Sequence, residues 1–201
     1  MKKMTVLDRI VLLVTGLLAA YQVVVGVDNL ETLAMISYTI AFGVLLVACL
    51  LLIILGWEIL DSSLVVIVST IIPLSLSLGL VSEYLPDFTT AYLVFVCVGF
   101  LAVVLTRYSA PGKVAVIVLA VVHGVAGMII FLLPIVLSIR GETNPGFALV
   151  GVGGALIGIG GLLLSFLKTG KPIISREKII ALLPWLLLLM TACFVAGFSL
   201  S

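Results

Sequence analysis

Charged residues are sparse along this chain, and they divide it into long apolar intervals. Seven intervals contain no charged side chain; the shortest, 10–27, has 18 residues and the longest, 32–57 and 114–139, have 26. About 20 apolar residues cross the hydrocarbon core of a bilayer as a helix. Backbone groups inside lipid must pair within their own segment, so helices are expected rather than open strands. The other four intervals are 62–82, 88–106, 143–167 and 179–201.

The pattern predicts an all-α integral membrane protein that forms one domain over residues 1–201. The domain is a bundle of seven transmembrane helices, expected at about 10–27, 32–57, 62–82, 89–106, 113–139, 146–167 and 176–200. The connections between these helices are short.

Basic residues predict the orientation. With seven crossings, the N-terminus shares one side with the loops after the second, fourth and sixth helices. Of the ten Lys and Arg residues, only Arg140 lies on the other side. Loops on the cytoplasmic side are enriched in Lys and Arg, so we expect the N-terminus in the cytoplasm, the C-terminus outside, and the chain in the plasma (inner) membrane. The nine residues on the N-terminal side are Lys2, Lys3, Arg9, Arg107, Lys113, Lys168, Lys171, Arg176 and Lys178.

Composition supports a lipid environment. Hydrophobic residues make up 64% of the chain and charged residues 9%, whereas a soluble domain carries about 25% charged residues. So few charges cannot cover a water-soluble globule of this size, and the bilayer is the expected surrounding. The net charge of +1 provides no general attraction for nucleic acid, which is not expected as a partner.

Small residues are concentrated in the interval 147–167. One helix face carries small residues at steps of three, four, three and four, and a second ridge repeats every seven residues. Small residues let neighbouring backbones approach closely in lipid. We therefore expect 147–167 to be the central packing helix. The first face holds Gly151, Gly154, Gly158, Gly161 and Ser165, and the second ridge holds Gly146, Gly153 and Gly160.

The third predicted helix contains an interior proline, Pro73, among hydroxyl residues. Proline leaves the carbonyl of the residue four earlier, Ser69, without its helical donor. With Ser75 and Ser77 nearby, a proline-broken helix with hydroxyls and a free carbonyl is typical of transporters. Alternatively, the hydroxyls satisfy the broken ladder locally. Gln22, the only amide well inside a predicted helix, either joins such a polar layer or bonds to a single neighbour.

His123 is the only histidine. It lies about 15 Å from the start of its helix at a rise of 1.5 Å per residue, near the middle of the membrane. An ionisable group at this depth is a functional candidate, either as a proton shuttle or as the ligand of one haem or chlorophyll-type metal. The alternative is a neutral imidazole bonded to a carbonyl of a neighbouring helix, which Gly124 and Gly127 would let approach.

Glu58 and Asp61 lie three residues apart between the second and third predicted helices. They form either a cation or proton site at the cytoplasmic mouth of these helices, or a solvated turn in which Asp61 caps the third helix.

Catalytic motifs are not apparent. The sequence has no Gly-x-Ser-x-Gly elbow, no His-Glu-x-x-His and no cysteine–histidine metal cluster, so an enzyme is not favoured and neither a metal nor a cofactor is required. We expect a helix-packing subunit or scaffold of a membrane assembly, whose partners are other membrane subunits or further copies of the chain. The alternative is a small transporter or channel for a small, weakly charged solute, which uses the broken third helix with His123 and Gln22.

Overall fold

The computed structural model describes residues 4–28, 30–109, 112–168 and 174–200, with only the backbone described for Asp61 and for residues 165–168. Within this part the chain is helical and contains no strand. The long helices are α1 (Val6–Val25), α2 (Thr32–Leu55), α3 (Ser63–Tyr84), α4 (Thr89–Ser109), α5 (Lys113–Arg140), α6 (Ala148–Lys168) and α7 (Arg176–Ser199). Three short 3₁₀ helices connect them: η1 (Trp57–Asp61), η2 (Pro86–Phe88) and η3 (Pro145–Phe147).

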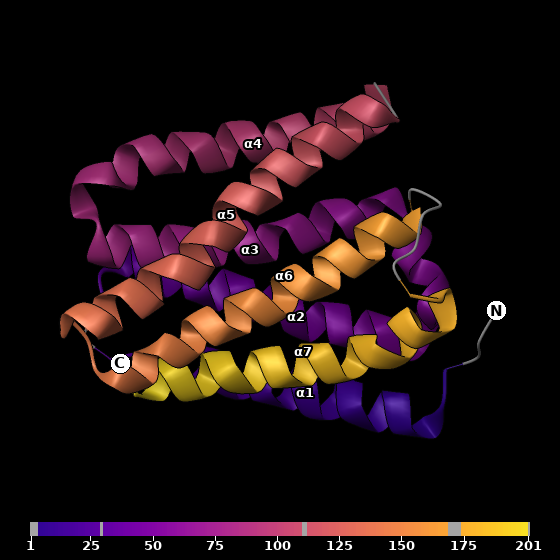
Figure 1. Cartoon of the computed structure of the whole chain (residues 1–201), viewed down its shortest axis with the longest axis horizontal. Helices are drawn as coiled ribbons and strands as arrows, with labels where there is room; N and C mark the ends of the chain where they lie inside the picture. Colours follow the sequence, from indigo (N-terminus) through magenta and orange to yellow (C-terminus); the bar gives the residue numbers. More distant parts are fainter. Residues whose placement is uncertain (1–3, 29, 110–111, 169–173, 201) are drawn as a thin grey trace.

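Seven of the described helices are long and apolar enough to cross a membrane, which confirms the predicted number of spans. The start of α1 and the end of α7 lie at opposite ends of the bundle (Figure 1). Lys2, Lys3 and Lys171, which contribute to the predicted orientation, lie outside the described residues.

The first helix begins earlier than its charge-free interval. Thr5 and Asp8 form a capping box, in which the Asp8 N–H donates to Thr5 Oγ1 at 3.1 Å and the Thr5 N–H donates to Asp8 Oδ2 at 2.9 Å. A carboxylate in the first turn is favourable there, so charge does not end the helix. The end of α2 is set by Gly56, whose φ of +75° suits glycine, and this places Trp57 in η1.

Six helices form a closed ring. Each of α1, α2, α3, α5, α6 and α7 packs against the next, and α7 packs back against α1. Side chains from all six fill the centre. Aromatic rings dominate the core near the C-terminal end of α7: Tyr38 lies 4.7 Å from Phe198 between ring centroids, and Phe147 lies 5.1 Å from Tyr84.

The most enclosed helix is α3, not α6. Within their most apolar windows, 61% of α3 is buried but only 33% of α6, so the expectation that 147–167 is the central helix is wrong. Small residues control how closely a neighbour approaches. How many neighbours surround a helix is a different property, and α3 packs against α2, α4 and α5.

The helix outside the ring is α4, which packs against α3 and α5 (Figure 1). A separate small core cluster lies beneath it and includes Ile67 and Leu74 of α3, Val103 of α4, and Val122 and Ala126 of α5. Large apolar side chains of α4, among them Val94, Val98, Leu101 and Leu105, are exposed.

Candidate functional site

Helix α3 continues as one α-helix through Pro73, although proline has no N–H to donate to the carbonyl of Ser69. Its hydroxyl groups bond to carbonyls of their own helix: Ser69 Oγ donates to Val66 O at 3.0 Å, and Ser77 Oγ donates to Pro73 O at 2.6 Å. Close packing by neighbouring helices and local hydroxyl bonds together hold a proline-containing segment helical in an apolar environment. None of these hydroxyl bonds ends on the carbonyl of Ser69, so local satisfaction of the proline site stays a prediction.

Ser77 makes a second contact that the sequence pattern did not indicate. The hydroxyl of Tyr92, on α4, donates to Ser77 Oγ at 2.9 Å, and Ser77 is fully buried. This bond ties α4 to α3. Ser75 is half-buried and makes no hydrogen bond in the described part of the chain. The sequence did contain a signal for this contact: Tyr92 lies within a predicted span, and a buried tyrosine hydroxyl needs a hydrogen-bond partner.

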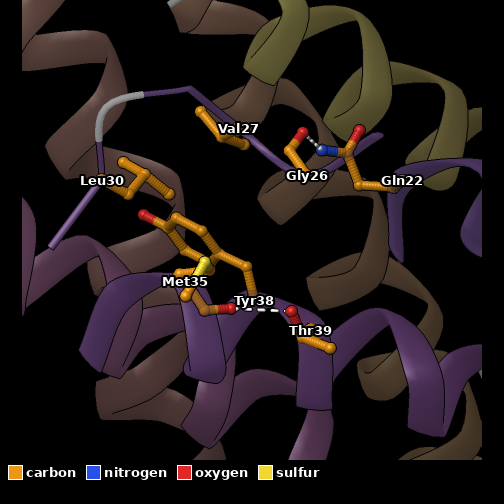
Figure 2. A pocket seen from close by; sticks show the side chains of 7 residues that line it. All are labelled: Gln22, Gly26, Val27, Leu30, Met35, Tyr38 and Thr39. Atoms are coloured by element: carbon orange, nitrogen blue, oxygen red, sulfur yellow. Dashed lines mark hydrogen bonds between the residues drawn. The ribbon is translucent and has the colours of Figure 1, made fainter. Parts of the chain in front are cut away.

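Gln22 lies beside a cavity between α1 and α2 (Figure 2). Its Nε2 donates to Gly26 O at 2.7 Å, so the amide satisfies the end of its own helix. The cavity measures about 10 Å³, close to the smallest volume that holds one water molecule. Figure 2 shows the Tyr38 hydroxyl pointing away from Gln22. The lining residues are Gln22, Gly26, Val27, Leu30, Met35, Tyr38 and Thr39.

His123 is half-buried on α5 and lies 3.2 Å, through Nδ1, from the carbonyl oxygen of Leu119. A carbonyl can only accept, so in this bond Nδ1 carries the proton and Nε2 is left as an acceptor. The expected bond to a neighbouring helix is wrong, because the partner belongs to α5 itself. Gly124 and Gly127 have no atom within 4 Å of an added Cβ, so no helix approaches them closely. The haem or chlorophyll-type ligand remains a prediction, and Nε2 is the nitrogen that would bind such a metal.

Glu58 lies in the 3₁₀ helix η1 and is exposed. The side chain of Asp61 lies outside the described part, and the N-cap of α3 is Ser62, without a side-chain capping bond. The predicted capping of α3 by Asp61 therefore lies outside the described part and stays a prediction. Among the described residues, no group of three or more His, Cys, Asp and Glu side chains could hold a metal ion.

The glycines near the N-terminal end of α6 lie against two neighbours. A Cβ added at Gly151 would lie 2.6 Å from the carbonyl oxygen of Phe131 on α5, and one at Gly154 would lie 3.0 Å from the Phe131 nitrogen. On the other ridge, a Cβ at Gly153 would lie 2.6 Å from the ring of Phe194 on α7. Each ridge thus faces a different helix.

The same helix leaves two of its six glycines open. Gly158 and Gly161 are exposed and have no atom within 4 Å of an added Cβ, as at Gly124 and Gly127 on α5. Figure 1 shows α5 and α6 close together near the turn that joins them and separating toward their other ends. The side chain of Ser165, the last member of the predicted face, lies outside the described part.

The predicted polar residues are not brought together. Gln22, Ser77 and His123 lie on α1, α3 and α5, and no hydrogen bond joins any two of them. The chain matches no protein-family model, no curated protein and no solved structure. Its function has to be inferred from its own residues.

Three buried polar atoms in the described part have no hydrogen-bond partner: Tyr38 Oη, Trp57 Nε1 and Arg107 Nε. The sequence pattern marked Arg107 only as a determinant of orientation. The sequence could have indicated the burial of Arg107. An arginine in the last turn of a span directs its side chain toward the N-terminal end of its helix, and so into the bilayer.

Proposed function

We propose that this protein is a helix-packing subunit or scaffold of a membrane assembly. The observation that carries the proposal is the open glycine surface, which we define as Gly124 and Gly127 of α5 with Gly158 and Gly161 of α6. In lipid, helices associate through close packing, and small residues permit that packing. Four of the six glycines of α6 have neighbours within the chain, and the other two, Gly158 and Gly161, are open to a helix from another subunit or from a second copy.

The two helices that carry this surface are antiparallel neighbours. Phe131 of α5 lies level with Gly154 of α6. Moving four residues along each helix from this pair, in opposite directions along the chain, reaches Gly127 and Gly158. The same register brings Gly124 level with Gly161. The four glycines therefore lie at similar depths along the part of α5 and α6 where the two helices separate, as a surface open to a further helix would require.

We further propose that the chain lies in the plasma membrane with its N-terminus in the cytoplasm. The support is the asymmetry of Lys and Arg between the two ends of the bundle. In this orientation the open glycine surface lies near the middle of the bilayer, close to the level of His123.

The alternative of a small transporter has less support. Its candidate residues are bonded within their own helices and lie apart, and α3 is unbroken. Uptake of small solutes into liposomes that changed with His123→Ala, or with Ser75→Ala combined with Ser77→Ala, would restore this alternative.

The scaffold proposal is tested by replacing Gly158 and Gly161 together with leucine. In a mild detergent, light scattering of the wild-type protein should give a protein mass above that of one chain, and the double variant should shift toward the single-chain mass. Gly43→Leu is a matched control, because Gly43 lies within α2 and also has open space around it. A wild-type protein that is a single chain both after extraction and in blue-native gels of whole membranes would contradict the proposal.

A further inference from the structure

Arg107, in the last turn of α4, is a charged side chain without a partner in the described part of the chain. Its Nε is completely buried and makes no hydrogen bond, and no carboxylate forms an ion pair with the guanidinium. The residue as a whole is half-buried, so the guanidinium is still reachable from outside the chain. A guanidinium stays charged and can only donate hydrogen bonds, so it needs an acceptor when it leaves water.

The Arg107 side chain points into the span. A helical side chain is directed toward the N-terminal end of its helix, which for the last turn of α4 is the direction of the bilayer. The charge of Arg107 acts on His123 of α5, which lies well inside the span. The guanidinium is therefore directed away from the cytoplasmic end of α4.

The packing of α4 on α5 gives the depth of this charge. A Cβ at Gly99 would lie 3.2 Å from Val122 Cγ2, and Figure 1 shows that α4 and α5 are antiparallel. Counting two turns along each helix from this contact, and about one turn back for the side chain, brings the Arg107 guanidinium close to the level of Leu119. The His123 ring reaches the same level, because its Nδ1 bonds to Leu119 O.

No carboxylate of this sequence is available at that depth. All nine acidic residues lie outside the seven charge-free intervals, so a second copy of the chain cannot supply the missing anion within a span. Phospholipid headgroups lie at the membrane edge, on the opposite side from the direction in which Arg107 points. A carboxylate on a spanning helix of a different protein can reach this level.

The helices beside Arg107 have room for a further helix. Within their most apolar windows only 17% of α4 and 17% of α5 is buried, the lowest values among the seven described spans. Leu101 and Leu105 on α4 and Ile117 and Val121 on α5 are each more than half exposed. In lipid, helices associate by packing and by polar contacts between them.

We propose that α4 and α5 dock a membrane-spanning helix of another subunit, and that an Asp or Glu of that helix pairs with Arg107. The inference rests on the scaffold function and specifies the chemistry of the partner. Ionisable side chains within spans pair with one another, because a lone charge in lipid is costly. Arginine and carboxylate form two parallel hydrogen bonds, which also fix the register of the two helices.

The test uses a synthetic leucine–alanine transmembrane helix that carries one Glu about one turn inside its cytoplasmic end, and the same peptide with Gln. Fluorescence energy transfer measures the binding of each peptide to the protein in phosphatidylcholine vesicles. We expect the wild-type protein to bind the Glu peptide about tenfold more tightly than the Gln peptide, the size of one polar contact between helices in lipid. In Arg107→Gln this preference should fall to within about twofold.

Two variants serve as controls. Arg9→Gln removes an exposed charge at the same end of the bundle and should keep the preference. Arg107→Lys keeps the charge but not the planar fork, so its preference should be intermediate. Thermal unfolding of each variant separates loss of binding from loss of fold.

Equal binding of the two peptides by the wild-type protein, or an unchanged preference in Arg107→Gln, would overturn the proposal. Loss of the preference when phosphatidylglycerol is added to the vesicles would assign Arg107 to a headgroup phosphate and would also overturn it. A wild-type protein that assembles in native membranes but shows no preference for the Glu peptide would overturn this inference alone and leave the scaffold proposal standing.

Discussion

At the scale of single residues, Tyr38 and Gly79 show how closely two helices of the core approach. Tyr38 on α2 is 4% exposed, and its ring lies where a side chain at position 79 of α3 would begin. Glycine is needed here because any Cβ would overlap the ring carbons. The aromatic core around Phe198 is built on this contact.

We therefore expect Gly79→Ala to destabilise the protein by about 1–3 kcal/mol, the usual cost of overpacking a core. Thermal unfolding in detergent micelles measures the change. Gly43→Ala is the matched control on α2, where open space leaves only the gain in helix propensity, up to about 1 kcal/mol. A Tyr38→Leu change in the Gly79→Ala background should recover part of the loss. Equal stability of Gly79→Ala and wild type would show that the ring moves aside freely.

Other polar residues within the spans form hydrogen bonds to carbonyl groups of their own helix. Thr15 donates to Val11 O at 2.8 Å and Thr191 to Leu187 O at 2.7 Å, as hydroxyls do when a helix offers no better partner. Their residue types and depths in the spans are evident from the sequence, but their partners are not. This is why Ser77 and His123 could be selected as candidates while their bonds, to Tyr92 and to Leu119, could not be predicted.

At the scale of elements, α6 uses different glycines for different neighbours. Backbone atoms of α5 lie next to Gly151, whereas Gly161 faces open space. A backbone atom cannot move aside as the end of a flexible side chain can, so the two positions should respond differently to added volume.

Gly151→Val should lower the free energy of unfolding by about 1–3 kcal/mol, because it forces α5 and α6 apart. Gly161→Val should change it by less than about 0.5 kcal/mol, as for a surface substitution. Denaturant titration of both variants in the same micelles checks the difference. If Gly161→Val proves as costly as Gly151→Val in an isolated single chain, α5 and α6 are closer together than the structure has them.

The helix boundaries show which local signals were sufficient. The expected start of the second helix at 32 and of the seventh at 176 agree with α2 and α7. The predicted start of the first helix at 10 is four residues late, because the charge-free interval excludes Asp8 and Arg9, although charges are tolerated in a helix turn at the membrane edge. Charge therefore predicts where a span crosses better than where its helix begins.

At the scale of the whole molecule, the odd number of spans has a direct consequence for the two ends of the chain. Seven crossings would place the termini on opposite sides of the membrane, and the proposed orientation has the N-terminus in the cytoplasm. A green fluorescent protein fused to the N-terminus should fluoresce, and alkaline phosphatase fused to the C-terminus should be active. Exchanging the two reporters is the control. Termini that report the same compartment would contradict seven crossings.

The sequence by itself determined the class of protein, the number of spans and the approximate position of each. These properties depend on the transfer of a local segment into lipid, which composition and length decide. It also identified the residues that would be unusual in an apolar environment, such as Gln22 and His123. The small-residue ridges of α6 were evident from spacing alone, because helical periodicity is a local property.

Only the tertiary structure decided which helices are neighbours. It made α3 the enclosed helix, placed α4 outside the ring, closed Gly151 against α5 and left Gly161 open. It also left the Arg107 nitrogen without a partner. In lipid, apolar burial does not distinguish one helix pairing from another, so the arrangement depends on the fit between side chains that are distant in the chain, and that fit has no signature in local periodicity.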